Sequence, residues 1–539
     1  MSGQENRTEY LKDAFKRRTL STAKTVLEYH SKINIDETAP VIRSVGIICT
    51  IGPTSQKVEQ LEALISAGMN IARMNFSHGT HEYHGSTIEN VRAAAAKVYP
   101  HPIAIALDTK GPEIRTGMMK SGKDVTYKKG QALKISCNPA MREQCDENQQ
   151  YLEYPSLCKS LKAGSKIFIA DGMLILEVRE VLNDDMLMAE VKCDATIGSR
   201  KNCNLPGAII DLPAVSEKDR SDLLFGVEQK VDMVFASFIR KKEDIFDIRK
   251  VLGEEGKSIK IIAKVENHEG ITNIDEIVEH SDGVMVARGD MGMEIPLEKV
   301  FLAQKLIISK CNKNKKPVIC ATQMLESMIK NPRPTRAEIT DVGNAVTDGC
   351  DCVMLSGESA NGAYPVEAVT YMHKICKEAC SAIHYEKRFQ ELTASSHSTD
   401  TAEIVALSAV SAAFKVSAAA IIVLTTSGRS ATLLSHFCPN CPIIVITRSA
   451  PVARKLHVYR GLFPLEYPYA RKGTWTEDID ARLDFGIKKG LDMGFILPSS
   501  KVIFVCGYQP GSSTTNTMRI LSVEGDHHIG TPESNIVFK

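Results

Sequence analysis

The sequence predicts an α/β protein whose largest part is a (β/α)8 barrel. Eight short apolar runs without a polar face recur between residues 45 and 356, and helical patterns lie between them. Continuously apolar strands are typical of parallel sheets, which are buried on both faces. Eight such strand–helix units in succession predict closure into a TIM barrel. The expected strands are residues 45–50, 69–76, 103–108, 232–236, 259–266, 283–287, 317–321 and 352–356.

Helices are expected where apolar side chains recur at every third or fourth residue. The first such pattern contains Val58, Leu61, Leu64 and Ile65 and follows the first expected strand. The later expected helices are residues 81–98, 216–230, 242–255, 298–313 and 335–347.

The rhythm of strands and helices is interrupted between residues 112 and 212, where short segments of alternating polarity predict an all-β module. We expect this module to be a β-barrel lid on the rim of the larger barrel, where a lid can exclude water. After about residue 380, apolar runs at 420–424, 443–446 and 502–505 predict a second α/β domain, with the polar residues 390–400 as a linker or loop. The expected organisation is an N-terminal arm (1–38), a catalytic barrel (39–111 and 213–382), a lid (112–212) and a C-terminal domain (383–539).

Composition excludes two classes of partner. The chain has 66 Lys and Arg against 65 Asp and Glu, dispersed along the sequence, which argues against nucleic acid and membrane surfaces. No run approaches the roughly 18 to 20 apolar residues that span a bilayer. The first 40 residues lack an apolar signal core and carry Glu5, Glu9 and Asp13, so a cytoplasmic location is expected.

The 15 cysteines are scattered, mostly inside apolar runs, and are expected to be buried and reduced. Cys438 and Cys441 have CxxC spacing, but no second pair or histidine cluster lies near them in sequence, so a turn is favoured over a zinc or redox site.

In the N-terminal arm, Arg18 to Ser21 has the form of a kinase target, a short pattern that is common by chance.

A lysine and a carboxylate follow the fifth expected strand. Successive strand side chains point to opposite faces, so Lys264 and Glu266 point the same way. Buried charges are costly unless they are paired. A metal ion beside an anionic substrate would satisfy both residues, and a structural ion pair would satisfy them equally well. The lysine and glutamate alone leave these two hypotheses open.

Carboxylates at two strand ends favour the metal hypothesis. Asp290 is presented from a turn with Gly289 and Gly292 near it, and together with Glu266 it forms the best candidate pair. Two carboxylates without a cluster of His or Cys favour Mg²⁺ or Mn²⁺ over zinc. Lys264 beside such a site could neutralise the charge that moves between oxygens in a phosphoryl transfer.

A second group of polar residues follows the second and third strands. Arg73, Asn75 and Ser77 alternate along the chain and share a face at one strand end. An arginine suits a phosphate through its fork of donors. The neutral oxygens of Asn75 and Ser77, with Asp108 and Thr109, suit a hard monovalent or divalent cation.

The C-terminal domain contains an anion-binding pattern of its own. Residues 425–430, with the sequence Thr-Thr-Ser-Gly-Arg-Ser, follow a strand and precede a helix. Hydroxyls, backbone N–H groups and a helix N-terminus together form an anion site. An ordinary capped helix is the alternative.

Five motifs, in the same order along the chain, resemble pyruvate kinase. The resemblance extends from about residue 42 to 520, and several long motifs in order make it specific. The motifs are residues 74–79 (MNFSHG), 107–117 (LDTKGPEIRTG), 264–270 (KVENHEG), 286–292 (VARGDMG) and 321–328 (ATQMLESM).

The resemblance implies an enzyme that transfers the phosphoryl group of phosphoenolpyruvate to ADP in the last step of glycolysis, with Mg²⁺ (or Mn²⁺) and K⁺ as cofactors. It implies that Arg73 contacts the substrate phosphate, that Lys264 is the transition-state lysine, and that Thr322 with the backbone of Gly289 and Asp290 lines the substrate site. The implied Mg²⁺ ligands are Glu266 and Asp290, and the implied K⁺ ligands are Asn75, Ser77, Asp108 and Thr109. The implied nucleotide contacts are Asn75, Phe76, Ser77, His78, Arg115 and Lys201.

The resemblance also implies a homotetramer activated by fructose 1,6-bisphosphate. The implied effector residues are Thr425, Thr426, Ser427, Gly428, Arg429, Ser430, Trp475, Arg482, Gln509, Pro510, Gly511, Ser512, Ser513 and Thr514. Glu113 matches the K⁺-dependent form of the family. Gln509 replaces a residue that is often basic, and Asn202 and Cys203 replace the commoner Gly-Val. The residues beyond about 524 have no assigned role.

Two other function classes remain open at this stage. Another metal-dependent barrel enzyme acting on pyruvate or its enolate, such as an aldolase, would share the barrel, although the lid and Glu113 argue against it. A non-catalytic paralogue would retain the fold while sensing metabolites, although every acid, lysine and threonine of the motifs is present.

Overall fold

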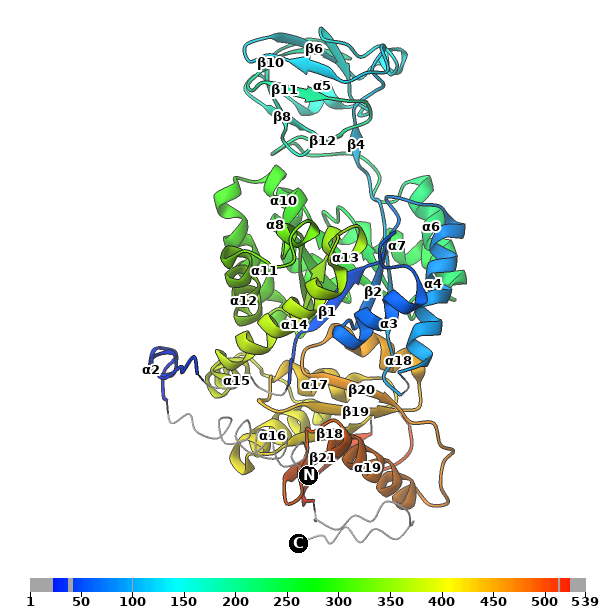
Figure 1. The fold of residues 1–539 in the computed structure, drawn as a ribbon, viewed down its shortest axis with the longest axis vertical. Coiled ribbons are helices and arrows are strands. Elements are labelled where there is room, and N and C mark those ends of the chain that lie inside the picture. Colours follow the sequence, from blue (N-terminus) through cyan, green and yellow to red (C-terminus); the bar gives the residue numbers. More distant parts are fainter. Residues whose placement is uncertain (1–22, 37–41, 99, 512–513, 524–539) are drawn as a thin grey trace.

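The computed structural model describes residues 23–36, 42–98, 100–511 and 514–523. Figure 1 shows a central barrel, with the β-rich module of residues 112–212 at one end and the C-terminal domain at the other. The expected fold class, a TIM barrel with an inserted all-β domain and a C-terminal α/β domain, is confirmed.

Eight parallel strands close the barrel, and each begins and ends within two residues of its predicted bounds. Side chains such as Ile48, Phe235 and Ile262 fill the interior, while their neighbours Ile47, Val234 and Ile261 pack outward against the helices. Burial on both faces explains why these strands are apolar throughout. The strands are β1 (Gly46–Thr50), β2 (Ile71–Asn75), β3 (Ala104–Asp108), β13 (Met233–Ala236), β14 (Lys260–Val265), β15 (Gly283–Ala287), β16 (Val318–Ala321) and β17 (Cys352–Leu355).

The predicted helices surround the barrel. They are α3 (Val58–Ala67), α4 (His81–Ala96), α6 (Glu217–Glu228), α7 (Lys242–Leu252), α11 (Val300–Lys313) and α12 (Arg336–Asp348). Serine or threonine capping boxes at Ser216 and Thr335 begin α6 and α12. The sequence did not reveal the shorter helices α8 (His268–Thr272), α9 (Ile274–His280), α10 (Arg288–Glu294) and α13 (Gly357–Ala360), or the longer α14 (Pro365–Ser381).

The inserted module has its own apolar core, which includes Tyr127, Leu133, Ile167 and Leu187. Seven strands pair in the order β4-β12-β8-β9-β10-β6-β7, and β5 pairs with β11. An isolated bridge between Thr116 and Leu152 joins the two edges of the seven-stranded sheet beyond β4 and β7, so the sheet curls into a barrel-like form. The strands are β4 (Ile114–Arg115), β5 (Val125–Tyr127), β6 (Ala132–Ser136), β7 (Gln149–Tyr151), β8 (Lys166–Ile169), β9 (Leu174–Asn183), β10 (Met186–Val191), β11 (Ala195–Ile197) and β12 (Asn202–Asn204), with one short helix, α5 (Leu157–Ser160).

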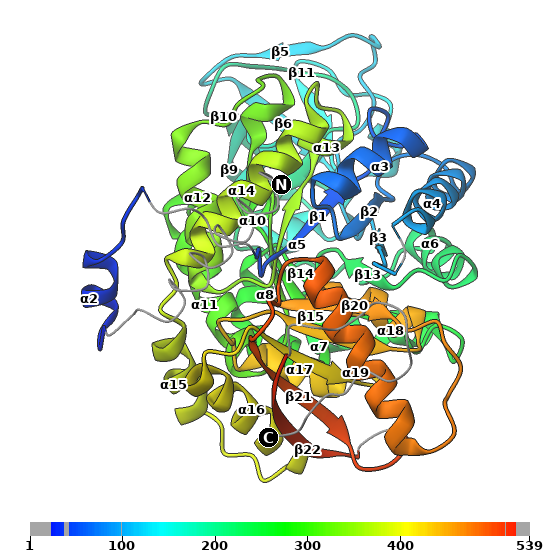
Figure 2. The same ribbon diagram turned by 60° about the horizontal axis from the view of Figure 1, so that its bottom comes forward.

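The C-terminal sheet has five strands in the order β20-β19-β18-β21-β22, of which β22 is antiparallel. Ile421 and Val423 face α16 and α17, whereas Ile422 and Leu424 face α19, which lies across the sheet in Figure 2. The strands are β18 (Ala420–Leu424), β19 (Ile443–Thr447), β20 (Leu462–Glu466), β21 (Lys501–Gly507) and β22 (Thr515–Ser522). The helices are α15 (Tyr385–Ala394), α16 (Thr401–Val416), α17 (Arg429–His436), α18 (Ala450–Lys455) and α19 (Trp475–Asp492).

Three features of the C-terminal half differ from the prediction. Strands β20 and β22 were not expected, because edge strands need not be apolar and β20 contains Pro464. Helix α15 extends to Ala394, so only residues 395–400 of the predicted 390–400 linker form a connection.

The described part of the N-terminal arm contains one short helix, α2 (Val26–Ser31). The hydroxyl of Tyr29 donates a 2.8 Å hydrogen bond to the carbonyl of Ser381 at the end of α14, and its ring stacks on His384. The kinase-target pattern at Arg18 to Ser21 lies outside the described residues, as does the tail from 524.

None of the 15 cysteines, all of which lie in the described part of the chain, forms a disulfide, and both Cys438 and Cys441 are buried. Among the described residues, no helix is both long and apolar enough to cross a membrane.

Candidate active site

The carboxyl ends of the barrel strands bring four of the predicted charged residues into one buried cluster. Arg73 lies on β2, Asp108 ends β3, Lys264 lies on β14, and Glu266 follows the end of that strand. All four side chains are buried. We call these residues the rim cluster.

Asp108 is the centre of the rim cluster. Arg73 donates from Nε to Asp108 Oδ2 at 2.6 Å, and Lys264 donates from Nζ to Asp108 Oδ1 at 3.0 Å. Burial would raise the pKa of Asp108, but the charges of Arg73 and Lys264 outweigh burial and lower it. Arg73 also donates from Nη1 to Thr50 Oγ1 at 2.8 Å, so its guanidinium is held from two sides.

Lys264 and Glu266 form an ion pair, with Nζ 3.1 Å from Oε1. The structural ion pair that the sequence left open is therefore present, and it is part of a larger network. Burial would lower the pKa of Lys264, but Asp108 and Glu266 raise it, so the lysine stays charged. Burial raises the pKa of Glu266 to about 7, and the nearby Asp290 adds to this rise.

Asp290 lies in the first turn of α10, next to Glu266. Burial raises the pKa of Asp290, and the charges of Asp171 and Glu113 in the lid add to the rise. Two neighbouring carboxylates that both resist ionisation would be stabilised by a divalent cation. Among the described residues, no three His, Cys, Asp or Glu are grouped to hold a metal, so substrate or water would supply the remaining ligands.

Thr322 directly follows β16 with φ of 75°, and Gln323 follows with φ of 56°. A β-branched residue at positive φ is strained, and such strain is typical of functional sites. A Cβ on Gly289 would come within 2.8 Å of Thr322 Cγ2, so glycine permits this close approach. Arg288 donates from Nη2 to the Thr322 carbonyl at 2.7 Å and holds the strained residue in place.

The four residues predicted to bind K⁺ come from the ends of β2 and β3. Asn75 and Asp108 are direct neighbours in the strand register, and Asn75 Oδ1 accepts a hydrogen bond from the Ser77 amide at 3.2 Å. Asp108 and Thr109 are buried beside them. All four offer oxygen atoms, which fits a hard cation.

The sequence did not single out Ser237 and Phe238, which follow β13. The Ser237 hydroxyl accepts a 2.6 Å hydrogen bond from Lys264, and the Phe238 amide donates to Glu266 Oε2 at 2.5 Å. Neither residue belongs to a charged motif that would have drawn attention to it. The only indication in the sequence was that both residues follow the fourth barrel strand, where active-site residues of such barrels lie.

The predicted nucleotide residues lie on two parts of the molecule. Phe76 is buried and stacks on His84 with ring centroids 4.0 Å apart. Arg115 lies in the lid, where it donates from Nη2 to Glu113 Oε2 at 2.7 Å, and Lys201 is exposed there. Glu113 is therefore engaged by Arg115, with Lys110 Nζ at 3.9 Å.

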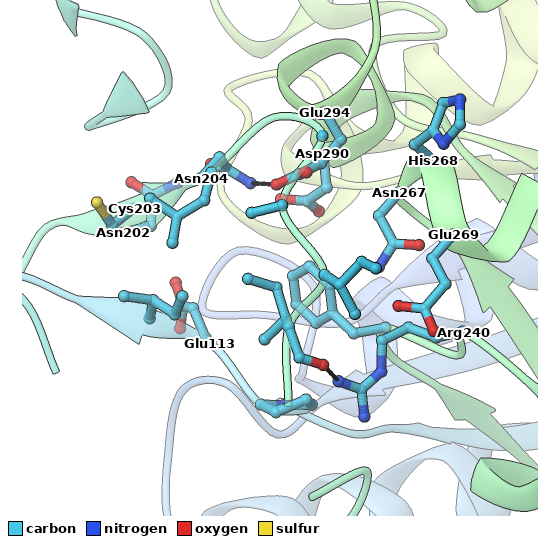
Figure 3. A pocket seen from close by; sticks show the side chains of 18 of the residues that line it. Glu113, Asn202, Cys203, Asn204, Arg240, Asn267, His268, Glu269, Asp290 and Glu294 are labelled. Atoms are coloured by element: carbon cyan, nitrogen blue, oxygen red, sulfur yellow. Dashed lines mark hydrogen bonds between the residues drawn. The ribbon is translucent and has the colours of Figure 1, made fainter. Parts of the chain in front are cut away.

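A cavity of about 320 Å³ lies between the barrel and the two segments that connect it to the lid, residues 112–114 and 202–210. Figure 3 shows Asn204 of the lid donating to Glu294 of α10 beside Asp290, at 3.0 Å. Of the predicted substrate and metal residues, only Asp290 lines this cavity; Arg73, Lys264 and Thr322 do not. The chemistry of the rim cluster, and not the volume of this cavity, therefore locates the candidate active site.

A second candidate site lies in the C-terminal domain, where a cavity of about 30 Å³ is lined by Thr425, Thr426, Ser427, Arg429, Ser430, Trp475, Arg482, Gln509, Gly511 and Thr514. Gly428 has φ of 90° at the start of α17. Arg482 lies over the Trp475 ring and pairs with Asp478, and the buried Trp475 Nε1 has no hydrogen-bond partner among the described residues. Asp400 pairs with Arg429 at 3.0 Å. Ser512 and Ser513 lie outside the described residues.

Comparisons with known proteins give a consistent result over both candidate sites. The family model described as pyruvate kinase, barrel domain, matches residues 42–369, and the model described as pyruvate kinase, alpha/beta domain, matches residues 403–521. The human protein named pyruvate kinase PKLR is 52% identical over 509 residues, which are 93% of this chain and 88% of that protein. Proteins named pyruvate kinase from Hypocrea jecorina (49% identical, 90% of this chain and 91% of that protein) and Candida albicans (48% identical, 92% and 99%) are also similar.

Proposed function

The chain belongs to the pyruvate kinase family and is a pyruvate kinase, and we propose that the rim cluster together with Asp290 and Thr322 carries its chemistry. The enzyme transfers the phosphoryl group of phosphoenolpyruvate to ADP, which gives pyruvate and ATP in glycolysis. The observation that carries the assignment is the ammonium of Lys264, buried and charged between Asp108 and Glu266.

Arg73 binds the phosphate of phosphoenolpyruvate in this proposal. Its Nε and Nη1 contact Asp108 and Thr50, while Nη2 has no partner among the described residues. A guanidinium held at two of its nitrogens is already oriented for an anion and loses little freedom on binding.

Lys264 offsets the negative charge that develops on the transferring phosphoryl group and on the enolate left behind. Its raised pKa keeps it protonated throughout the physiological range. A fixed cation in a buried site acts without solvent reorganisation, which is the main source of electrostatic catalysis. Thr322 and the backbone of Gly289 and Asp290 line the substrate where the enolate accepts its proton.

Members of this family use a divalent cation and K⁺. Glu266 and Asp290 fit Mg²⁺ or Mn²⁺, and Asn75, Ser77, Asp108 and Thr109 fit K⁺, because each set presents oxygen ligands from the ends of two neighbouring strands. The cations would neutralise phosphoryl and enolate charge and orient the substrate.

Glycolysis is cytoplasmic, so we also place the enzyme in the cytoplasm.

We assign the nucleotide to the space between the lid, taken as residues 112–212, and the barrel (39–111 and 213–382). Asn75, Phe76, Ser77 and His78 would contact it from the barrel, and Arg115 and Lys201 from the lid. The hydrogen bond from Asn204 to Glu294 supports a lid that rests on α10, the helix that carries Asp290. A closed lid would keep water from the phosphoryl group.

The C-terminal domain, residues 383–539, is proposed to bind fructose 1,6-bisphosphate as an activator. The unpartnered Trp475 Nε1 and the adjacent Arg482 support an anion site beside the hydroxyls of residues 425–430. The remaining proposed contacts are Gln509, Pro510, Gly511, Ser512, Ser513 and Thr514.

A homotetramer is the proposed assembly. Phe301 and Leu302 at the start of α11, with Leu297 in the turn just before it, are exposed apolar side chains, at 57%, 54% and 72% exposure. Contiguous exposed apolar side chains mark association surfaces. Phe301→Glu should therefore reduce the mass measured by analytical ultracentrifugation; an unchanged mass would place the contact elsewhere.

Saturation curves for phosphoenolpyruvate, measured with ADP in a coupled assay, test the proposal. With bisphosphate present, the curve of the native enzyme should shift to lower substrate concentration. Arg482→Gln should require about tenfold more bisphosphate, and Trp475→Phe should need more because the ring loses its donor. A native curve that the bisphosphate does not move would refute the effector assignment while leaving the pyruvate kinase activity intact.

A further inference from the structure

Ser237 lies at the end of β13 and touches both the predicted transition-state lysine and the predicted K⁺ site. Its hydroxyl is buried, 2.6 Å from Lys264 Nζ and 2.6 Å from the carbonyl oxygen of Thr109. A lysine ammonium only donates, so the Ser237 oxygen must accept from it. Two acceptors lie within reach of the single hydroxyl hydrogen, the Thr109 carbonyl at 2.6 Å and Asp108 Oδ1 at 3.3 Å. The much shorter contact assigns the hydrogen to Thr109, so the chain of hydrogen bonds runs from Lys264 through Ser237 to Thr109.

A second hydrogen bond joins the same two residues. The Ser237 amide donates to Thr109 Oγ1 at 3.1 Å, so both oxygens that Thr109 offers accept from Ser237. Each of these oxygens keeps a lone pair that can bind a cation. Ser237 therefore orients both atoms through which Thr109 would ligate K⁺.

The turn that carries Ser237 is itself tightly placed. Phe238 has φ of 55° while its amide binds Glu266, and a Cβ on Gly111 would come within 2.8 Å of the Ser237 Cβ. Neighbouring groups thus hold the serine on both sides. A shift of the Thr109 oxygens on cation binding would be transmitted to Lys264 through the serine hydroxyl.

We propose that Ser237 is a positioning residue that couples K⁺ binding at Asp108 and Thr109 to the placement of the Lys264 ammonium. The inference rests on the proposed K⁺ site. Networks of hydrogen bonds in a buried site hold their members together more firmly than isolated pairs do. Loss of the hydroxyl should therefore weaken monovalent-cation binding and the chemical step together.

The test compares Ser237→Thr with Ser237→Val, which have nearly the same shape and differ in the hydroxyl. Binding of Tl⁺, a K⁺ substitute, is followed by ²⁰⁵Tl NMR, and kcat and KM are measured over a range of K⁺ concentrations. We expect Ser237→Val to weaken Tl⁺ binding about tenfold and to lower kcat about 10- to 100-fold, with KM for phosphoenolpyruvate within about threefold. Ser237→Thr should restore both properties to within a few-fold of the native enzyme.

Ser281 provides a matched control, because it is another buried serine of the barrel whose hydroxyl has no hydrogen-bond partner among the described residues. Ser281→Ala should leave Tl⁺ binding and kcat unchanged. Ser237→Val with native Tl⁺ affinity and lowered kcat would overturn the coupling. A native enzyme that neither binds Tl⁺ nor depends on K⁺ would instead remove the K⁺ site of the proposed function, and the coupling with it.

Discussion

At the barrel rim, the buried cations Arg73 and Lys264 share the single carboxylate of Asp108. The C-terminal candidate site presents mainly hydroxyls, one indole N–H, and two arginines, Arg429 and Arg482, that each pair with a separate aspartate. The rim charges come from the ends of three strands of a closed barrel, but the C-terminal site is built from loops and from helices α17 and α19. Strong electrostatic interactions in a buried site require fixed, mutually compensating charges. A site of hydroxyls and backbone amides binds anions more weakly and reversibly, which suits regulation better than chemistry.

The largest expected effect is at the rim. Lys264→Met removes the charge that we propose offsets the phosphoryl group, and kcat should fall at least about a thousandfold while the fold is retained. Activity is measured in the coupled assay, and folding by circular dichroism. Lys260→Met, on the same strand at its opposite end beside Tyr459, is the control and should keep kcat within about threefold. Retained phosphotransfer in Lys264→Met would contradict the lysine assignment.

The next effect tests how rigidly the rim is built. Gly289→Ala would place a methyl group 2.8 Å from Thr322 Cγ2, so kcat/KM should fall about 10- to 100-fold. Gly343→Ala in α12 meets no atom within 4 Å and should be neutral or stabilise the protein by about 0.5–1 kcal/mol. Equal activities for the two variants would show that the approach of Gly289 to Thr322 is not needed.

A smaller effect is expected at the C-terminal site, where charge can be added. Gln509→Arg should lower the bisphosphate concentration for half-activation about three- to tenfold, because it supplies a guanidinium where the site has an amide. The gain should shrink at high salt, and Gln509→Glu should shift activation the opposite way. The constants are read from activation curves at two ionic strengths. A gain that is independent of salt would exclude an electrostatic cause.

The smallest effect concerns the junction between the two regions. His457 belongs to the C-terminal domain and its Nε2 lies 2.6 Å from the carbonyl of Pro102 in the barrel. Burial lowers the pKa of His457 to about 4. The unfolded chain therefore binds more protons below about pH 6.5, and stability is lost as the pH falls from 6.5 towards 4.

His457→Gln should remove about 1 kcal/mol of this loss of stability at pH 5.5, because glutamine takes up no proton. At pH 8 the histidine is neutral in both the folded and the unfolded chain, so protonation makes no difference between the two proteins there. Thermal unfolding of both proteins at pH 8, 6.5 and 5.5 measures the difference. If the stabilities of the two proteins fell in parallel with pH, the pKa of His457 would be the same in the folded and the unfolded chain.

The barrel strands could be predicted because each is apolar on both faces, as Ile47 and Ile48 illustrate. Short helices such as α10 and edge strands such as β20 escaped prediction, since their sequences follow neither a full helical period nor continuous burial. In the candidate site, the placement of Arg73, Asp108, Lys264 and Glu266 near one another followed from parallel strands ending at one rim. Ser237 and Phe238 carry no such signal, because a serine and a phenylalanine after a strand are common.

The sequence by itself determined the barrel, the order of its strands along the chain, the inserted β module and the residue types that end each strand, because periodicity and burial are local properties of a chain. Only the tertiary structure decided which of those residues meet. Asp108 lies between Arg73 and Lys264, Lys264 reaches Ser237, and Trp475 Nε1 is left without a partner among the described residues. These contacts join residues far apart in the chain. The short distances and the burial that shift the pKa values of the rim cluster exist only once the barrel has closed.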